Sequence, residues 1–326
     1  MSPAALNCVP GLAGELQSKQ TDDEGSRRAA LANWITDPRN LLTRRAIVNR
    51  VWQYHFGLGI VDTPNDFGHM GSAPTHPELL DWLAHWFLDH GESLKQLHHL
   101  IVTSATYLQS SGAANGSSQL SSSLMPASAK ENSRVPTNAA TLDADNRLLW
   151  RMNRQRLDAE SFHDTLLFLS GRLDFTMGGP SARQFFFKDD HSPVYDYTRF
   201  QVDSPDGSRP SIYRFIVRSV PDPFMETLDC PDASLLTPKR NITLTALQAL
   251  STLNNPFVLR QCELFAARLQ RDCSDPSEQI DRAYRMALSR PPRPSEANLL
   301  RDYVRKHGLA NACRLLFNSS EFVFVD

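Results

Sequence analysis

Apolar residues recur with helical spacing along most of the chain. The clearest stripe runs through THPELLDWLAHWFLDHG and consists of Leu79, Leu83, Trp86 and Phe87. Polar residues fill the opposite face, as in a helix that packs on one side against a core. Thr75 and Glu78 have the spacing of a capping box, and Gly91 supplies a helix stop. This pattern predicts a helix between Thr75 and Gly91.

Similar patterns predict helices over most of the remaining sequence. Ser26 is the expected cap of a helix that ends before Pro38, and Thr43 is the expected cap of a second that stops at Gly57. Further helical segments are expected at 93–108, 146–171, 243–254, 256–270, 276–289, 294–308 and 309–326. SIYRFIVR, residues 211–218, alternates and is rich in β-forming residues, and it is the one convincing strand candidate.

The predicted architecture is mainly α, an irregular multi-helix domain with a small β element near residues 211–218. Residues 1–25 lack periodicity and are expected to connect to an upstream domain that is missing from the chain. Residues 26–326 are expected to form one composite domain. A stretch rich in Ser, Ala, Gly and Asn, residues 110–141, predicts a flexible, disordered insert, because it offers little apolar surface to bury.

Charge and hydropathy narrow the choice of partners. The chain has 326 residues and a formal net charge of −2, so it lacks the basic excess typical of nucleic-acid binding. No stretch reaches the roughly 18–20 apolar residues of a membrane-spanning helix. The N-terminus does not have the pattern of a signal peptide, which on its own terms predicts a cytoplasmic protein. The sequence leaves the oligomeric state open.

Histidines gather in one part of the chain and give the first candidate for a site. Seven of the ten lie between His55 and His99. His55, Asp66 and His76 flank a glycine-rich loop between two strong helices, where imidazole and carboxylate groups are able to bind a metal or to act on a substrate. Arg50 or Arg240 would then bind an anion. In the competing interpretation, glycines shape the loop and the polar side chains bond to nearby backbone groups.

Cofactor motifs are absent from the sequence. No dinucleotide-binding, P-loop, zinc-protease or kinase signature occurs, and the five cysteines form no C-x-x-C-H haem attachment site. We therefore expect no cofactor in this chain. Cys262 and Cys313 fall in apolar helical patterns, which predicts that they are small buried hydrophobes.

Several longer segments resemble a known family. NRVWQYHFGLGIVDTPNDFG, LIVTSATYLQSS, SGRLDFTMGGPS, KRNITLTALQAL and AYRMALSRPPRPSE occur here in the order found in the domain of unknown function 1553, also called planctomycete-specific domain 1. The resemblance covers essentially the whole chain. It implies a C-terminal module of a larger exported envelope protein, in which a c-type cytochrome domain, and with it haem c, and a 1549-type domain precede this one. A periplasmic or cell-envelope location follows from the same resemblance.

Two functions remain open at this stage. The first is an accessory, non-catalytic module that docks onto the upstream domains of its parent protein, and the resemblance favours it because the family has no settled activity. The alternative is a hydrolase-like enzyme, acting on polysaccharide, with its site in the 55–78 loop. Whether the chain is an enzyme is therefore undecided, with the balance toward a non-catalytic role.

Overall fold

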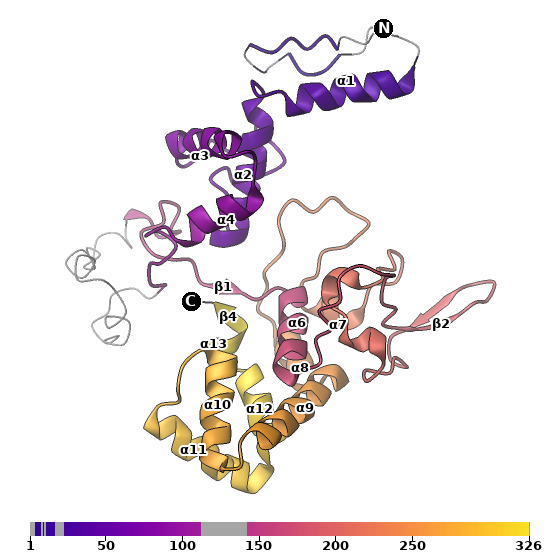
Figure 1. Ribbon diagram of the computed structural model, residues 1–326, viewed down its shortest axis with the longest axis vertical. Coiled ribbons are helices and arrows are strands. Elements are labelled where there is room, and N and C mark those ends of the chain that lie inside the picture. The colour runs from indigo at the N-terminus through magenta and orange to yellow at the C-terminus, as the bar shows by residue number, and fades with distance from the viewer. Residues whose placement is uncertain (1–3, 8, 10, 17–22, 112–141, 326) are drawn as a thin grey trace. The chain divides into compact units, whose positions relative to one another are not determined.

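The computed structural model describes residues 4–7, 9, 11–16, 23–111 and 142–325. Helices dominate these residues, and their strands form only two-stranded sheets (Figure 1). This confirms a mainly α fold with a small β element. The chain divides into two compact units, Met1–Gln155 and Arg156–Val325, each with a hydrophobic core of its own. The predicted insert at 110–141 lies, from residue 112 on, outside the described residues.

The described residues of the first unit include the helices α1 (Glu24–Thr36), α2 (Leu41–Phe56), α3 (Pro77–Asp89) and α4 (Leu94–Val102). The apolar faces of α2, α3 and α4 meet in one core, where Trp52 stacks on Phe56 with ring centroids 4.2 Å apart. Ile60 and Val61, from the loop between α2 and α3, complete this core. The loop is thus anchored from within.

A buried arginine joins α1 to α2. The Arg44 guanidinium donates to the carbonyls of Thr36 and Asp37, at 2.8 and 2.5 Å. These carbonyls lie at the end of α1, where no following turn of the helix supplies N–H groups to them. The same guanidinium pairs with Glu92, which follows α3. Because Arg44 is buried, these contacts are needed to offset the loss of its hydration.

Helix α1 differs from the other long helices because none of its residues is buried. The Trp34 Nε1 group donates to the Ala13 carbonyl at 3.1 Å, and Arg39 donates to the Gly11 carbonyl, so part of the expected connector lies against this helix. Leu31 and Ile35, one helical turn apart, remain exposed. An isolated helix of this length is marginally stable in water.

The second unit is centred on α9 (Pro256–Asp272), which packs against α6 (Ala159–Ser170), α8 (Ala246–Asn254), α10 (Pro276–Leu288) and α12 (Leu309–Phe317). Phe265 of α9 stacks on Phe317 of α12 at 5.5 Å. The remaining helices of the unit are α7 (Pro223–Thr227), α11 (Pro294–His307), α13 (Ser320–Val323) and the short 3-10 helices η2 (Pro205–Ser208) and η3 (Ser211–Tyr213).

Two small sheets accompany these helices. β1 (Gln155–Arg156) pairs with β4 (Phe324–Val325), and β2 (Phe186–Lys188) pairs antiparallel with β3 (Val194–Asp196). The predicted strand at 211–218 is wrong. Residues 211–213 form η3, and one isolated bridge, Ala182 to Arg214, is the β pairing of this segment. The Asp164 carboxylate accepts the Ser211 N–H group with both oxygens, which holds the backbone in a turn instead of a ladder.

Several predicted helix starts are displaced. Asp23, and not Ser26, caps α1. Thr43 lies inside α2, where its hydroxyl donates to the Ile35 carbonyl. Thr75 and Glu78 form no capping box, since His76 occupies the cap position of α3 without a side-chain bond.

The helix expected at 146–171 begins only at Ala159. Asn146 and Leu149 both have positive φ angles, which an α-helix does not accommodate. The Asn146 side chain donates to the Arg151 carbonyl and to the Asn153 side chain, and so stabilises an irregular turn.

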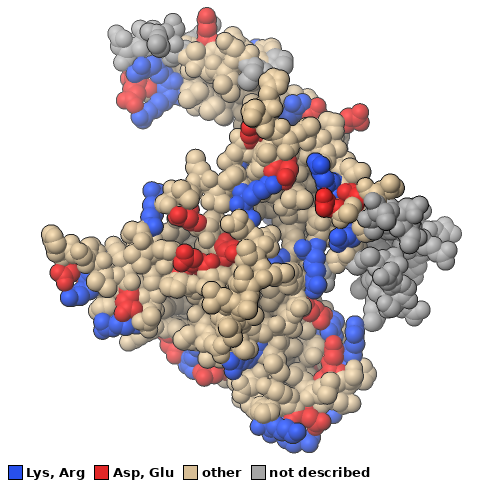
Figure 2. All heavy atoms as spheres, turned by 180° about the vertical axis from the view of Figure 1, so that it is seen from behind, with Lys and Arg blue, Asp and Glu red and all other residues tan. Residues whose placement is uncertain are grey.

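On the face shown in Figure 2, acidic and basic side chains are interspersed. Many charged side chains of the described residues are paired, as Asp203 is with Arg172 and Arg260. No helix in the described part of the chain combines the length and apolarity needed to cross a bilayer. Cys262 and Cys313 are free and buried, as predicted.

Candidate functional site

The structure places the predicted site residues of the first unit in separate local interactions. The His55 Nε2 atom lies 2.7 Å from the His98 Nδ1 atom, while Asp66 Oδ1 accepts the Gly68 N–H group at 2.8 Å. His76 Nδ1 lies 2.9 Å from the Thr75 hydroxyl. Among the described residues, no three His, Cys, Asp or Glu side chains are grouped so as to hold a metal ion.

The two arginines of the hypothesis also have partners. Arg50 donates to the Asn65 side chain at 2.7 Å, next to Asp66 in the loop. Arg240 belongs to the second unit, where it makes a bidentate pair with Glu160 at 2.6 and 2.8 Å. These bonds match the interpretation in which the polar side chains support the local structure.

His55 has an environment that keeps its imidazole neutral. Its ring meets Tyr107 edge-on, with centroids 5.6 Å apart, and it lies beside His98. Partial burial, and then repulsion from His98, lower the pKa of His55 below its usual value. A neutral His55 ring shares a hydrogen bond with His98 without adding a positive charge beside it.

The 55–78 loop nevertheless lines a cavity. Its volume is about 570 Å³, and its polar lining includes Asp62, His76, Asp145 and Arg147. Of the three predicted residues, His76 is the one that lines this cavity. The buried Asn49 side chain holds this loop in place by bonding to Val61.

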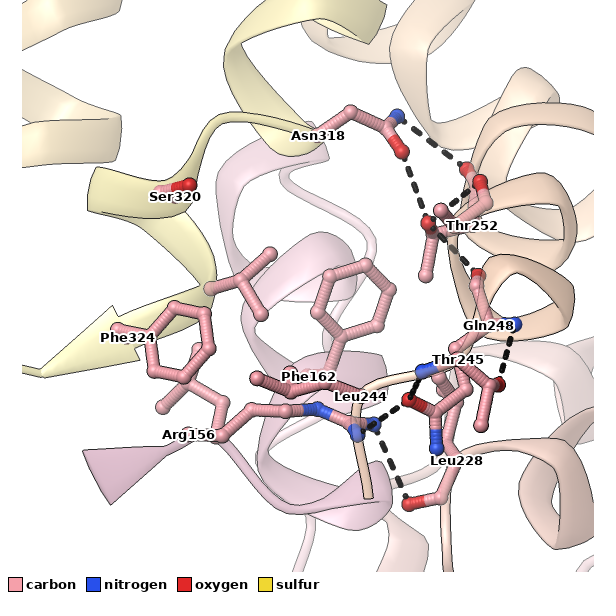
Figure 3. Close-up of a pocket in the computed structure, with 13 residues that line it drawn as sticks. Arg156, Phe162, Leu228, Leu244, Thr245, Gln248, Thr252, Asn318, Ser320 and Phe324 are labelled. Carbon is pink, nitrogen blue, oxygen red and sulfur yellow. Dashed lines mark hydrogen bonds between the residues drawn. The ribbon is translucent and has the colours of Figure 1, made fainter. Parts of the chain in front are cut away.

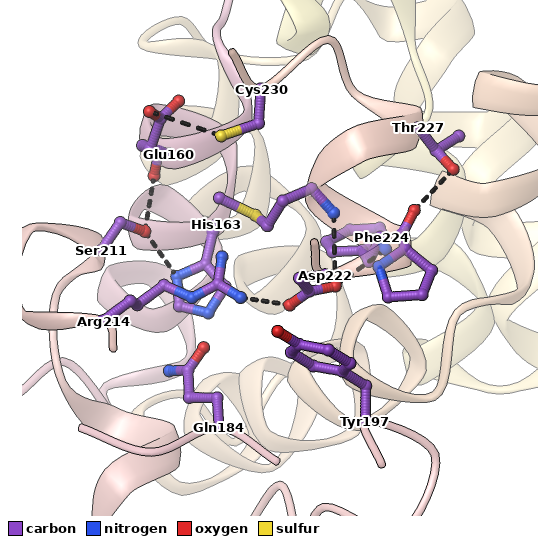
Figure 4. A network of polar contacts seen from close by, with 12 residues as sticks. Glu160, His163, Gln184, Tyr197, Ser211, Arg214, Asp222, Phe224, Thr227 and Cys230 are labelled. Atoms are coloured by element: carbon purple, nitrogen blue, oxygen red, sulfur yellow. Dashed lines mark hydrogen bonds and ion pairs between the residues drawn. The ribbon is translucent and has the colours of Figure 1, made fainter. Parts of the chain in front are cut away.

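The second unit contains a buried polar network that sequence inspection did not single out (Figure 4). His163 of α6 is buried and stacks on Phe257 with centroids 4.4 Å apart. Its Nδ1 atom lies 2.9 Å from Asp164 Oδ1 and 3.1 Å from Ser211 Oγ. Burial, the largest effect, lowers the pKa of His163 in spite of Asp164, so the ring is neutral.

Ser, His and Asp occur together here without the geometry of a hydrolytic triad. In a triad the serine and the carboxylate bond to opposite ring nitrogens. Here both lie at Nδ1, and the Ser211 hydroxyl donates directly to Asp164 at 2.8 Å. Burial raises the pKa of Asp164, but the bonds from His163 and Ser211 outweigh it and the net change is downward. The group anchors η3 to α6 and does not activate the serine.

Next to this network is an open groove of about 690 Å³, lined by Asp158, Glu160, Asp164 and Arg240 together with apolar side chains. The pKa of Glu160 is lowered, since its hydrogen bonds and the charge of Arg240 outweigh the effect of burial. Glycoside hydrolysis needs one carboxyl group with a raised pKa to serve as an acid. Glu160 and Asp164 are both held ionised, so this pair lacks that acid.

A third cavity, of about 330 Å³, lies between α6, α8 and the β1–β4 pair (Figure 3). Leu228, Leu244 and Val323, with the rings of Phe162 and Phe324, form its apolar wall. One end is polar because Arg156 Nη1 donates to Gln248 Oε1 at 2.9 Å and to the Thr243 carbonyl at 2.7 Å.

Asp229 balances the charge of Arg156 at this end of the cavity. Its carboxylate lies 3.3 Å from Arg156 Nη1 and also accepts hydrogen bonds from Thr243 and Gln248. Burial acts to raise the pKa of Asp229, but these hydrogen bonds and the arginine charge lower it overall. Arg156 and Asp229 therefore form a neutral pair of two ionised groups.

Sequence inspection missed this cavity for a physical reason. Its leucine, valine and phenylalanine residues have the helical or β spacing of an ordinary core, and Arg156 lies in RMNRQR, an arginine-rich stretch of the kind that commonly forms ion pairs. The residues come from four separate segments of the second unit. A single weak signal was available, the T-x-x-Q spacing of Thr245 and Gln248, which forms a true capping box at the start of α8.

Comparison with known proteins gives the family of the chain and no activity. No curated protein and no solved structure matches the chain. Residues 27–304 match the model of one family, PSD1, described as a protein of unknown function (DUF1553). That match spans most of the chain and agrees with the resemblance found in its motifs. The chain therefore belongs to the PSD1 (DUF1553) family.

Proposed function

We propose that this chain is a non-catalytic accessory module, which docks onto a neighbouring domain of a larger exported envelope protein. The observation that carries the proposal is a set of large aliphatic side chains exposed within 16 residues of the second unit. They are Leu235, Leu236, Ile242, Leu244, Leu247 and Leu250. Exposed large apolar side chains that gather in one region are typical of protein interaction sites.

The segment that carries Leu235 and Leu236 is a loop with anchored ends. Asp229 at one end accepts the N–H group and the hydroxyl of Thr243 at the other end. In Figure 1 the chain between α7 and α8 extends as a large loop. Leu236 is 95% exposed and Leu235 is 68% exposed. Because the ends of the loop are already held by hydrogen bonds, less conformational entropy is lost when its exposed leucines bind a partner.

Helix α1 gives independent support. It is a long helix without a buried residue, and Leu31 and Ile35 remain exposed on it. Covering these residues with a partner would supply the tertiary packing that stabilises most helices in proteins. The partner that we propose is the 1549-type domain, which precedes this domain in the proteins that the chain resembles. We place haem c in a cytochrome-type domain further upstream, and the parent protein in the periplasm or cell envelope.

The experiment is a binding measurement between the full chain and a separately produced 1549-type domain from the same parent. Leu235→Ser/Leu236→Ser should weaken binding by about tenfold or more, because two buried leucines contribute on the order of 1.5–3 kcal/mol each. Leu299→Ser, at another exposed leucine on α11, is the matched control and should bind as the wild type does. Equal affinity for all three proteins, or no binding by the wild type, overturns the proposal.

The hydrolase alternative keeps one supporting observation, the cavity of about 570 Å³ that His76 helps to line. Its test is release of reducing sugar from bacterial and algal polysaccharides by the full chain, with His76→Ala as the inactive variant. Activity that His76→Ala abolishes would favour the enzyme over the docking module. Activity that persists in His76→Ala would not belong to this cavity.

A further inference from the structure

The Arg156 end of the 330 Å³ cavity carries hydrogen-bond donors that protein groups do not use. The Arg156 side chain is 7% exposed, so its donors lie out of bulk water. Nη1 makes three hydrogen bonds, to Asp229, Thr243 and Gln248, while Nη2 makes one long contact of 3.5 Å to the Leu228 carbonyl. Nε donates to none of the described residues. A guanidinium has five N–H donors, so Nε and Nη2 keep donor capacity for a ligand in the cavity.

The charge balance at this end selects the kind of acceptor. Asp229 already neutralises Arg156, and its carboxylate is satisfied by Thr243 and Gln248. A second carboxylate brought to Arg156 would lie close to Asp229 in a poorly hydrated place, where like charges repel strongly. A neutral acceptor, such as an amide or ester carbonyl oxygen, takes the remaining donors without that repulsion.

The body of the cavity selects the rest of the ligand. Figure 3 shows the rings of Phe162 and Phe324 between the Arg156 end and an opposite end where Thr252 and Asn318 bond to each other. The volume, about 330 Å³, is at the lower end of the range for small-molecule sites, and the apolar lining with few polar groups is typical of them. The space therefore suits a short aliphatic chain or a single ring.

We propose that this cavity binds a small neutral amphipathic molecule. Its carbonyl oxygen accepts hydrogen bonds from Arg156, and its apolar body lies between Phe162, Leu244 and Phe324. Leu235 and Leu236, the leucines substituted in the docking test, do not line this cavity, although Leu244 of the same exposed set does, so the two proposals are tested by different variants. It lies within the second unit and uses residues of α6, α8, β1 and β4.

The probe is octanamide, offered to the full 326-residue chain and followed by isothermal titration and by saturation-transfer difference NMR. Octanoate and octylammonium have the same chain with a negative or a positive head group. Octanamide should bind, and the affinity for each charged analogue should be lower by about tenfold or more. Absence of octanamide binding at millimolar concentration overturns the proposal, since the cavity then holds water only. Octanoate binding as tight as octanamide overturns the neutral head-group assignment.

Two neighbouring substitutions on α8 locate the site without disturbing the core. Ala249 is exposed and lines the cavity, so Ala249→Phe should block it and reduce octanamide affinity by about tenfold or more. Ala246, at the start of α8, is exposed and does not line it, so Ala246→Phe is the matched control and should leave the affinity unchanged. Octanamide that binds Ala249→Phe as tightly as the wild type shows that it binds elsewhere, and the proposal fails.

Arg156→Lys tests the head-group contact. Lysine keeps the positive charge but loses the planar fork of donors. The preference for octanamide over octanol should then fall, while octanol itself binds as before. If Arg156→Lys keeps the wild-type preference for octanamide, Arg156 does not bind the head group. Circular dichroism and the urea midpoint of each variant show whether the fold is retained.

Discussion

Asn49 and Val61 are joined by two hydrogen bonds. Asn49 Nδ2 donates to the Val61 carbonyl at 2.9 Å, and the Val61 N–H group donates to Asn49 Oδ1 at 2.8 Å. Both residues are buried, so one side chain on α2 satisfies the backbone of the loop before α3. The conformation of the 55–78 loop depends on this pair, because a loop of this kind has no ladder to hold it.

Replacing Asn49 with Ala leaves a buried N–H group and a buried carbonyl without partners. We expect a loss of about 3 kcal/mol in the free energy of unfolding of the first unit. Urea unfolding measures this, and hydrogen exchange of a peptide that contains Val61 should show lost protection. Asn33→Ala, at an exposed position of α1, is the control and should change stability by at most about 0.5 kcal/mol. Unchanged protection of Val61 in Asn49→Ala would contradict the anchoring role.

Gly59 is required by the same contact. A Cβ atom there would lie 2.6 Å from the Val61 carbonyl oxygen and 2.8 Å from Asn49 Nδ2. Gly59→Ala should therefore destabilise the first unit by about 1–3 kcal/mol. Gly25→Ala is the matched control, since its Cβ atom meets nothing closer than the Asp23 carboxylate at 3.4 Å. In the first turn of α1 this change should be neutral or stabilising by up to about 1 kcal/mol. Thermal unfolding of the two variants distinguishes these outcomes.

The buried His163 makes the stability of the second unit depend on pH. Its ordinary pKa is 6.5, and burial, helped by the charge of Arg214, lowers it in the folded state against the opposing effects of Asp164 and Asp222. As the pH falls below 6.5, the unfolded chain binds the proton first. The stability contribution is therefore present above this pH and is lost as the pH falls toward the lower pKa of the folded state.

His163→Gln should flatten this dependence. Urea midpoints measured from neutral pH to about pH 5 should fall less in His163→Gln than in the wild type, whatever the absolute stability of the variant. His307→Gln removes an exposed histidine of α11 and should retain the wild-type slope. Equal slopes in all three proteins would exclude His163 as the source.

Thiol chemistry reports on the core of the second unit. Burial raises the pKa of Cys262 to about 12 and raises that of Cys313 further, so neither forms an appreciable amount of the reactive thiolate near neutral pH. Iodoacetamide should alkylate both only when urea unfolds the unit, whereas the half-buried Cys273 should react in the folded protein. Mass spectrometry of the peptides measures the order. Alkylation of Cys262 as fast as that of Cys273 would show that the core opens readily.

The helices that were predicted best are those whose own sequence contains the signals for the apolar face and for the first residue. α3 and α9 have long apolar stripes and proline near their first residue, and both occur close to the expected bounds. The caps were predicted less well, because several side chains could serve and the choice depends on neighbours. Thr75 matches the capping pattern, but its hydroxyl lies beside the Ile60 carbonyl and His76.

The segment at 211–218 shows why propensity alone was not sufficient. Its alternation favours a strand, yet no strand lies beside it among the described residues except for the single bridge at Ala182. Asp164, 47 residues away in the chain, determines its turn instead. The Arg156 cavity was beyond sequence inspection for the same reason, since tertiary contacts bring its parts together.

The division at Gln155 and Arg156 has a consequence for biogenesis. Each core is made from one continuous stretch of chain, so the first is able to form before the residues of the second have been synthesised. The second core is different, because α6 at its start packs on α9 and belongs to a core that α12, near the C-terminus, completes. The apolar face of α6 therefore remains uncovered until α9 and α12 have been synthesised, and exposed apolar surface of this kind is what chaperones bind.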